Sequence, residues 1–238
     1  MRMFAGPNGS GKSTLKSILR PDLIGVYINP DEILQQNSLN LDQFEINTTI
    51  DEIKIFILNS SLANKIGLPK DNDFVSFDSG KLIFHNITIN SYLASILSDF
   101  LRNQLISQSI SFTFETVMSS MDKVEFLQKA CNYGYRTYLY YVATEDPAIN
   151  ISRVANRVKI GGHNVPEDKI VSRYYRSLGY LIEAVSYTSR AYIFDNSDYQ
   201  YYWLAEITQG CDLEIKTNKI PAWFKKNLWD KMLPWENN

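Results

Sequence analysis

The sequence has few cysteines and histidines, and it has no long apolar run. Its two cysteines, Cys131 and Cys211, lie far apart without the spacing of metal ligands, so we expect them only to pack, as is typical of a reducing compartment. No apolar stretch approaches the roughly 18 residues that a membrane span needs. The start, Met1 to Ala5, is too short for the apolar part of a signal peptide. We therefore expect a soluble cytoplasmic protein with no membrane partner.

The sequence also lacks an excess of charge of either sign. Lys and Arg number 24 and Asp and Glu number 26, which gives a net charge of −2. Proteins that grip a long nucleic-acid backbone carry a basic surface, so we expect no long nucleic acid as a partner. Any binding site for an anion must therefore be local.

What the chain does have is an alternation of short apolar runs with helical segments. It is long enough, at 238 residues of which 45% are hydrophobic, to bury an ordinary core. Strands are predicted at 1–5, 24–29, 111–115, 136–143 and 191–195, and helices at 13–20, from 30 onward, 119–132, 146–158 and 166–187. This alternation predicts an α/β fold of the P-loop kinase type, with a mainly parallel sheet and helices on both faces.

Two regions interrupt the alternation. From about 40 to 90, a helical stretch up to Lys65 precedes a hairpin signal around Asp78-Ser79-Gly80. After the last parallel strand, runs at 199–208 and 212–217 flank Gln209-Gly210, and Pro221 opens a final helix. We predict one domain over 1–238, with an insertion at about 40–90 and an antiparallel C-terminal extension.

A glycine-rich loop between the first strand and the first helix carries the clearest chemical signal. Residues 6–13 read GPNGSGKS and satisfy G-x-x-x-x-G-K-[ST] in the strand-loop-helix context that this motif requires. The alternative is a glycine-rich turn that only caps a helix. The predicted nucleotide-binding residues are Gly6, Pro7, Asn8, Gly9, Ser10, Gly11, Lys12, Ser13 and Thr14.

The residue types of this loop suit a nucleoside triphosphate. Glycines let backbone N–H groups converge on phosphate oxygens, and the helix N-terminus adds its positive dipole end. Lys12 is expected to reach the β and γ phosphates and to be essential for catalysis, and the Ser13 hydroxyl is expected to bind a magnesium ion. The predicted cofactors are therefore ATP and Mg²⁺.

Several segments resemble the zeta toxin family. The matching text is GPNGSGKST at 6–14, NPDE at 29–32, FET at 114–116 and RVANRVKIGGHNVPEDKIVSRYYRSL at 153–178, with DNS at 195–197 and IPAWF at 220–224 also similar. The resemblance implies a P-loop kinase, mostly a toxin of a bacterial toxin-antitoxin pair, that phosphorylates UDP-N-acetylglucosamine and is blocked by a small antitoxin. Between about 37 and 95 this sequence is longer than compact members of the family.

Acidic residues follow two of the predicted strands. Asp31 comes after the second strand, whose carboxyl end should share the sheet edge of the phosphate loop. An acid there can take a proton from a hydroxyl, or it can simply offset the dipole of a first helical turn. The resemblance implies that Asp31 is the general base and binds the acceptor. It also makes Glu115 and Thr116, which end the third strand, contacts to the acceptor or to magnesium-bound water, the alternative being a helix cap.

The segment from Arg153 to Arg176 carries a local excess of positive charge around Gly161-Gly162. Its basic residues are Arg153, Arg157, Lys159, Lys169, Arg173 and Arg176, against Glu167 and Asp168. Arginines stabilise charge on a transferring phosphoryl group. With the resemblance, we expect a lid in which Arg157 and Arg173 are catalytic and Arg176 binds the acceptor. The alternative is a solvated helix face. We expect His163 to make only local hydrogen bonds, and His85 stays unassigned.

Three functions are compatible with these observations. The first is a kinase for the hydroxyl of a nucleotide sugar, with ATP as donor. The second is a kinase for another small acceptor, such as a nucleoside, an antibiotic or a polynucleotide end. The third is an ATP-binding switch that needs no acceptor, which Asp31 and the arginines disfavour.

Overall fold

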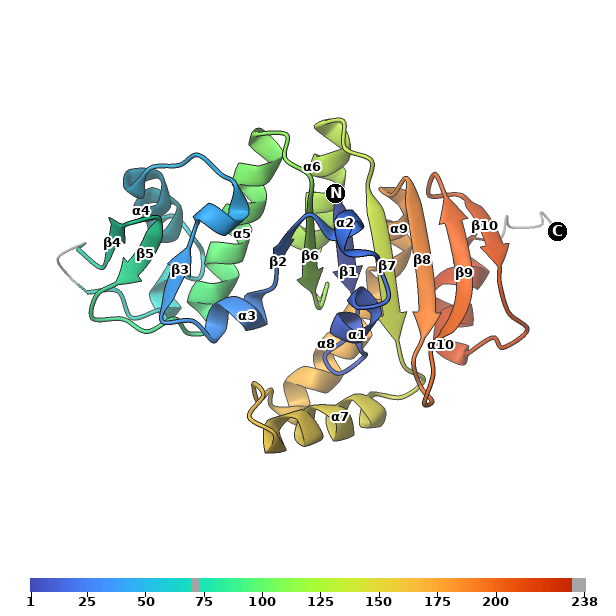
Figure 1. Cartoon of the computed structure of the whole chain (residues 1–238). Coiled ribbons are helices and arrows are strands. Elements are labelled where there is room, and N and C mark those ends of the chain that lie inside the picture. The colour runs from blue at the N-terminus through green and yellow to red at the C-terminus, as the bar shows by residue number, and fades with distance from the viewer. Residues whose placement is uncertain (70–72, 233–238) are drawn as a thin grey trace. The chain divides into compact units, whose positions relative to one another are not determined.

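A computed structural model describes residues 1–69 and 73–232 of the chain (Figure 1). They form two compact units, which we call unit 1 (Met1–Leu23 and Glu115–Asn238) and unit 2 (Ile24–Phe114). Unit 2 contains the predicted insertion together with the second strand and its helix. None of the helices in the described ranges combines the length and the apolar character that crossing a membrane demands.

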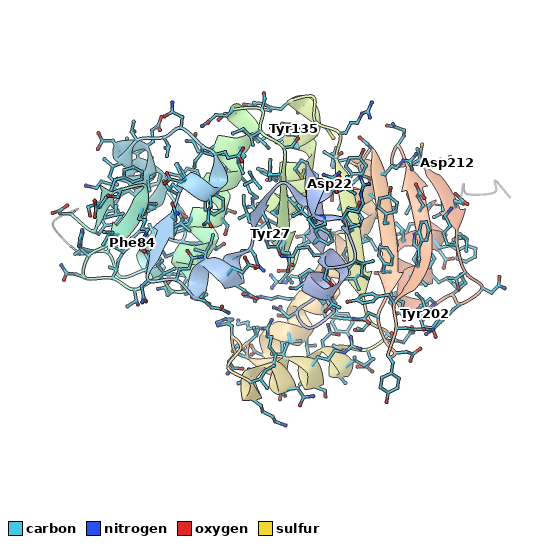
Figure 2. The ribbon with its side chains drawn as sticks, in the orientation of Figure 1. Asp22, Tyr27, Phe84, Tyr135, Tyr202 and Asp212 are labelled. Carbon is cyan, nitrogen blue, oxygen red and sulfur yellow. The ribbon has the colours of Figure 1, made fainter. Side chains whose placement is uncertain are left out.

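The strands of unit 1 follow the spatial order β10-β9-β8-β7-β1. They are β1 (Arg2–Ala5), β7 (Tyr138–Ala143), β8 (Arg190–Asp195), β9 (Tyr202–Thr208) and β10 (Asp212–Ile215). Strand β7 pairs in parallel with both β1 and β8, whereas β8, β9 and β10 pair antiparallel. Figure 2 shows Tyr202 and Asp212, the first residues of β9 and β10, at opposite ends of the hairpin. The predicted antiparallel extension is confirmed.

The helices of unit 1 pack against its strands and against one another. They are α1 (Lys12–Lys16), α2 (Pro21–Ile24), α6 (Met121–Asn132), α7 (Pro147–Lys159), α8 (Glu167–Gly179), α9 (Leu181–Ser186), α10 (Ala222–Phe224), the π-helical turn η3 (Lys225–Trp229) and α11 (Asp230–Met232). The side chain of Asp146 caps α7 by accepting a hydrogen bond from the backbone N–H of Ala148, and Pro147 is its first residue. This is the start that the sequence predicts.

The predicted helix over 166–187 is wrong in one respect, because it is two helices. The chain breaks between α8 and α9 at Tyr180, after Gly179. Helix α8 packs on α7, and α9 packs on α6. The break therefore lets the two halves of the segment pack against different helices. Figure 1 shows α7 and α8 side by side. Their shared core consists of buried Val154, Val165 and Ile170, with Ile151 and Val158 packed against them.

Unit 2 holds a pair of parallel strands, which belongs to the seven-stranded sheet, and a small antiparallel sheet. In the pair, β2 (Val26–Ile28) pairs in parallel with β6 (Phe112–Thr116), which runs on into unit 1. Because this pair and the neighbours of β7 are parallel, the fold class is confirmed as α/β with a mainly parallel arrangement. The antiparallel sheet has the order β3-β5-β4 and consists of β3 (Ser38–Asn40), β5 (Lys81–Phe84) and β4 (Val75–Asp78). The hairpin predicted around Ser79 is confirmed, with φ of 49° at Ser79 and 79° at Gly80.

The helices of unit 2 differ from the prediction in two ways. They are α3 (Pro30–Leu34), η1 (Asp42–Phe44), α4 (Ile50–Leu58), η2 (Ala63–Lys65) and α5 (Ser91–Ser107). The helical stretch expected up to Lys65 is broken, because a capping box of Thr49 and Glu52 starts α4 only at Ile50. The long helix α5 was not predicted. The residue that marks its start is the N-cap Asn90, whose side chain accepts hydrogen bonds from the backbone N–H groups of Tyr92 and Leu93.

We predict that Gly210→Ala destabilises the protein far more than Gly134→Ala. Both glycines have positive φ, but a methyl group on Gly210 would lie 2.8 Å from the carbonyl oxygen of Ser186, whereas nothing lies within 4 Å at Gly134. Gly134→Ala should lower the free energy of unfolding by about 1 kcal/mol, and Gly210→Ala by about 3 kcal/mol. Urea unfolding measures both. Equal decreases in the free energy of unfolding would mean that the β9–β10 turn does not pack closely against α9.

Candidate functional site

The glycine-rich loop occupies the space between the end of β1 at Ala5 and the start of α1 at Lys12. Gly6, Gly9 and Gly11 have φ of 141°, 74° and 102°, a region that side-chain-bearing residues avoid. A methyl group on Gly6 would lie 2.0 Å from the carbonyl oxygen of Val142, and one on Gly9 would lie 2.7 Å from that of Asn150. A methyl group on Gly11 would lie 2.4 Å from Asn196 Nδ2 and 2.5 Å from the Tyr201 hydroxyl oxygen, so all three glycines are required both by conformation and by close packing.

Three side chains from distant parts of unit 1 hold the backbone of this loop. Asn150, on α7, donates from Nδ2 to the carbonyl oxygen of Asn8 at 2.5 Å. Asn196, after β8, donates from Nδ2 to Ser10 O at 2.8 Å, and the Tyr201 hydroxyl donates to Gly11 O at 2.6 Å. Because its carbonyls are fixed in this way, the loop has a defined conformation before any ligand binds.

Lys12 lies across this loop. Its Nζ donates to the carbonyl oxygens of Gly6 at 2.8 Å and Pro7 at 3.0 Å. Phosphate oxygens can replace these two neutral acceptors, and they bind an ammonium group more strongly. The position therefore suits a lysine that turns to an anion in the loop.

Ser13 and Glu115 come together beside the loop, although 102 positions separate them in the sequence. The Ser13 hydroxyl donates to Glu115 Oε2 at 3.1 Å, and Glu115 is only 6% exposed. A hydroxyl and a carboxylate are ligands that Mg²⁺ accepts, and this ion usually takes one or two carboxylates plus phosphate oxygens and water. In the described ranges no group of three or more His, Cys, Asp or Glu residues could hold a metal. The donor set therefore fits a magnesium ion that arrives with phosphate.

Thr116, the next residue, has a local role in the structure. Its hydroxyl oxygen accepts a hydrogen bond from the backbone N–H of Met118 at 3.0 Å, and Met118 has a φ of 53°. This is the turn-forming contact that the alternative interpretation expects. A contact of Thr116 with an acceptor or with magnesium-bound water stays a prediction.

A cavity of about 560 Å³ adjoins the end of the phosphate loop. Arg153 forms part of its wall, because its guanidinium donates to the carbonyl oxygens of Asn196 at 2.7 Å and Asp198 at 3.2 Å. The residues that line it are Thr14, Arg153, Asn196, Ser197, Asp198, Tyr199 and Tyr201. Arg153 thus differs from the other basic residues of the predicted lid, since it is built into a pocket next to the loop.

Sequence reasoning missed several residues of this site. Asn150, Asn196 and Tyr201, which hold the loop, were not predicted to do so. Arg153 was predicted only as one of the basic residues of the lid. The one available signal was the similarity of 195–197 to zeta-like kinases. A hydrogen-bonded path also joins the loop to α8, because the buried Tyr174 hydroxyl donates to Thr144 O at 2.6 Å and the Thr144 hydroxyl bonds to Asn150. Burial, more than nearby Glu145, raises the pKa of Tyr174, so its hydroxyl stays a donor.

The arginines of the predicted lid differ in how firmly they are held. Arg157 donates from Nη2 to the carbonyl oxygen of His163 at 3.0 Å. A methyl group on Gly162 would lie 2.4 Å from Arg157 Cγ, so the glycine joint is shaped around this arginine. Arg176 is exposed and donates from Nε to Ser172 O, one turn back on its own helix, at 3.4 Å. Arg173 is half-buried.

Asp31 lies in unit 2, in the first turn of α3. The side chain of Asn29 accepts a hydrogen bond from the backbone N–H of Asp31 at 3.0 Å, and Asn29 Nδ2 donates to Glu32 Oε1 at 3.5 Å. Asp31 is exposed whereas Asn29 is buried. The cap therefore belongs to Asn29. The carboxylate of Asp31 is exposed, and its role as the general base stays a prediction.

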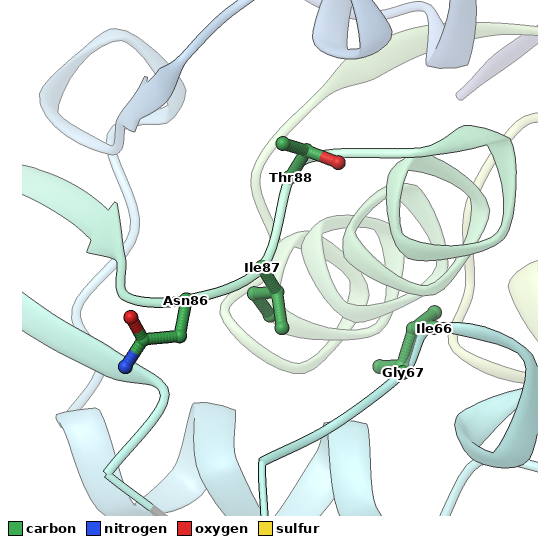
Figure 3. Close-up of a pocket in the computed structure, with 5 residues that line it drawn as sticks. All are labelled: Ile66, Gly67, Asn86, Ile87 and Thr88. Atoms are coloured by element: carbon green, nitrogen blue, oxygen red, sulfur yellow. The ribbon is translucent and has the colours of Figure 1, made fainter.

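Unit 2 also contains a cavity of about 500 Å³ (Figure 3). Its lining consists of Ile66, Gly67, Asn86, Ile87 and Thr88. None of these residues is ionisable, so this cavity offers no acid, base or cation for phosphoryl chemistry. His85 lies beside it in sequence and bonds through Nε2 to the Ser76 hydroxyl at 2.7 Å, across the hairpin.

Comparisons with known proteins bear on this site. The zeta toxin family model matches residues 90–204, a stretch with Glu115, the α7–α8 pair and Asn196 but without the phosphate loop. An uncharacterized protein of Haemophilus influenzae (strain ATCC 51907 / DSM 11121 / KW20 / Rd) is 26% identical over 174 residues, which is 72% of this chain and 89% of that protein. The resemblance to the zeta toxin family is thereby confirmed.

The solved structure of one complex shows the same fold. The crystal structure of AvrRxo1-ORF1:-ORF2 with ATP aligns with 100% of this chain at 14% identity and a TM-score of 0.54, and this chain spans 66% of the length of the chain it matches. A structure of the PezAT chromosomal toxin-antitoxin system of Streptococcus pneumoniae aligns with 84% of this chain and 71% of that chain, at 17% identity and a TM-score of 0.47.

We predict that Lys12→Ala weakens the binding of inorganic tripolyphosphate by at least about thirtyfold, because a desolvated charge contact is lost. The melting temperature should hardly change, since the carbonyl oxygens of Gly6 and Pro7, to which Lys12 donates, belong to its own loop. Titration calorimetry measures the affinity. Arg20→Ala, which removes an equal charge from an exposed surface pair with Asp22, is the control. Equal affinity of both variants would mean that the loop does not hold the anion through Lys12.

Proposed function

Because the motifs and the matching family model both show a resemblance to the zeta toxin family, we propose that this chain is an ATP-dependent kinase. It transfers the γ-phosphoryl group of ATP to a hydroxyl of a small acceptor. The observation that carries the proposal is the preformed phosphate loop, with Lys12 lying across it and the Ser13–Glu115 pair beside it. A purely structural turn needs neither feature.

The cavity next to Thr14 is the place for the nucleoside of ATP. Arg153 offers a flat guanidinium held by two carbonyls, and Tyr199 and Tyr201 supply aromatic rings. A nucleobase can stack on such planar groups. The AvrRxo1-ORF1 complex, which has the same fold, was crystallised with ATP, and this supports ATP as the nucleotide.

Magnesium would be held by the Ser13 hydroxyl and by Glu115, either directly or through water. When bound, the ion neutralises the negative charge that the triphosphate carries. The chain's own residues do the rest of the positioning. Lys12 binds the β and γ phosphates, and the backbone of 6–14 fixes the triphosphate through a loop that is already folded.

In the transfer step, Asp31 accepts the proton of the acceptor hydroxyl. The hydroxyl oxygen then forms a bond to the γ phosphorus while the bond from that phosphorus to the β–γ bridging oxygen breaks, and ADP leaves. Arg157 and Arg173 stabilise the charge on the γ oxygens, and Arg176 binds the acceptor. These roles rest on the resemblance and on the exposed position of the Asp31 carboxylate.

The acceptor that the resemblance favours is UDP-N-acetylglucosamine. A nucleoside, an antibiotic or a polynucleotide end is the alternative, because the match to the family model starts at residue 90 and leaves the insertion at about 40–90 uncovered. A protein of this kind would be a toxin, with a small antitoxin as its partner.

The proposal is tested by incubating the protein with [γ-³²P]ATP and magnesium, first with UDP-N-acetylglucosamine and then with fractionated cell metabolites. We expect label to appear in one acceptor, identified by mass spectrometry, and none with Lys12→Ala. If ADP and inorganic phosphate form at the same rate with every fraction and without any, the protein is an ATP-hydrolysing switch and the kinase proposal fails.

We predict that Asp31→Asn lowers kcat by about a hundredfold to ten-thousandfold and leaves the ATP dissociation constant unchanged. The free energy of unfolding should change by only a few tenths of a kcal/mol, because Asn29 provides the cap. Steady-state kinetics and calorimetry on one preparation measure the three quantities. Glu32→Gln, which neutralises the neighbouring exposed acid, is the matched control, and an equal effect of the two substitutions would reject Asp31 as the base.

We also predict that Arg157→Lys and Arg173→Lys both lower kcat, by up to about a thousandfold, and change the KM for ATP little. A lysine lacks the two-pronged donor geometry of a guanidinium. Only Arg157→Lys should also lower the melting temperature, since only Arg157 holds the glycine joint. Lys159→Met, on the exposed side of α7, is the control. Near-normal kcat in both arginine variants would place them on a solvated face.

A further inference from the structure

The two motifs at 195–197 and 220–224 meet in unit 1, through Asp195 and Trp223, to which no role has been assigned so far. Asp195 is fully buried, and its Oδ2 accepts hydrogen bonds from Trp223 Nε1 at 2.8 Å and from the Ser197 hydroxyl at 2.8 Å. The backbone N–H of Ser197 donates to its other oxygen at 3.2 Å. A buried carboxylate is costly unless it is satisfied in this way, so the network has a definite geometry.

The segment 217–224, which we call the strap, makes further contacts with the same region. Lys219 Nζ lies 2.7 Å from Asp198 Oδ2 and 3.7 Å from Asp195 Oδ1, and it sits 4.0 Å from the centre of the Tyr202 ring. The hydrogen bond to Asp198 raises the pKa of Lys219, so the ammonium form is favoured. The backbone N–H of Ala222 donates to Glu145 Oε1 at 3.1 Å.

These contacts lie at or directly beside the wall of the nucleotide cavity, and Lys219 contacts Asp198 in that wall. Asn196, Ser197, Asp198, Tyr199 and Tyr201 line that cavity, and we call residues 196–201 the wall. The strap holds Asp195 and Asp198, which lie just before and inside the wall. The Ser197 hydroxyl, besides donating to Asp195, accepts from the backbone N–H of Glu145 at 2.8 Å. The wall is therefore fixed from outside the cavity.

We propose that the strap is a positioning element for ATP, which keeps the wall of the nucleoside cavity in its binding conformation through Trp223 and Lys219. This inference rests on the proposed function in one respect, namely that the cavity takes the nucleoside of ATP. Neither residue lines the cavity. They act through Asp195 and Asp198.

The strap should affect the binding of the nucleoside and not the binding of the phosphates. Asn196 holds the phosphate loop, but it is itself held by two contacts that do not involve the strap, one from its N–H to Ala143 O at 2.8 Å and one from Arg153 to its carbonyl. Loosening the strap therefore leaves the loop in place. The wall then spends part of its time outside the binding conformation, and the apparent affinity for ATP falls by that fraction.

The test compares the binding of ATP and of inorganic tripolyphosphate by titration calorimetry. Lys219→Met removes the ammonium of a half-exposed residue and should lower the affinity for ATP by about two- to fivefold. Trp223→Phe keeps an aromatic ring but removes the N–H that donates a hydrogen bond to Asp195. It should lower the affinity for ATP by about tenfold or more. Both variants should bind tripolyphosphate like the wild type. Lys226→Met, an exposed lysine on the following turn, should change neither affinity.

The results separate the possible failures. If wild-type protein binds tripolyphosphate but not ATP, the proposed function is wrong and the inference falls with it. If the wild type binds ATP and Lys219→Met binds it equally well, the strap does not position the wall. If Lys219→Met lowers the affinities for ATP and for tripolyphosphate equally, the inference is also overturned, since the strap would then support the phosphate loop or the fold. Should Trp223→Phe fail to fold, Lys219→Met still decides.

Discussion

The fixing of three loop carbonyls by side chains is the constraint on which the rest of the site depends. Asn150, Asn196 and Tyr201 each donate to a carbonyl of residues 8–11. A glycine-rich loop loses more conformational entropy on ordering than any other sequence, so the loop needs such contacts to be ordered without a ligand. Phosphate binding then does not have to supply that ordering free energy.

The same three contacts explain why the surrounding elements are arranged as they are. Asn150 needs α7 close to the loop, and the Asp146 cap and Pro147 start that helix at the required residue. Asn196 needs the end of β8, where the strap fixes Asp195. Through Thr144 and Tyr174, α8 is joined to the same network. In a chain with a net charge of −2, Lys12 thus lies in this loop and Arg153 in the cavity beside it.

The sequence was sufficient for the parts that depend on local patterns. The phosphate loop, the parallel strands, the start of α7 and both hairpins follow from spacing, capping residues and turn chemistry. The residues that hold the loop could not be predicted, because they lie 142, 186 and 190 positions from their partners. The break at Tyr180 depends on which helices α8 and α9 pack against, which no local pattern records. Asp31 and Arg173 had recognisable positions, and their roles stay predictions.

Hydrogen exchange on the wild-type protein, with and without ATP and magnesium, tests the central claim most directly. A preformed loop predicts that the amide of Ser10, which donates to the carbonyl oxygen of Pro7 within the loop, already exchanges slowly without ligand. ATP should add protection to the other amides of 6–14 that bind phosphate, and to 196–201. Rapid exchange of the Ser10 amide in the free protein, or no added protection of either segment by ATP, would contradict the account of a preformed phosphate loop that binds ATP.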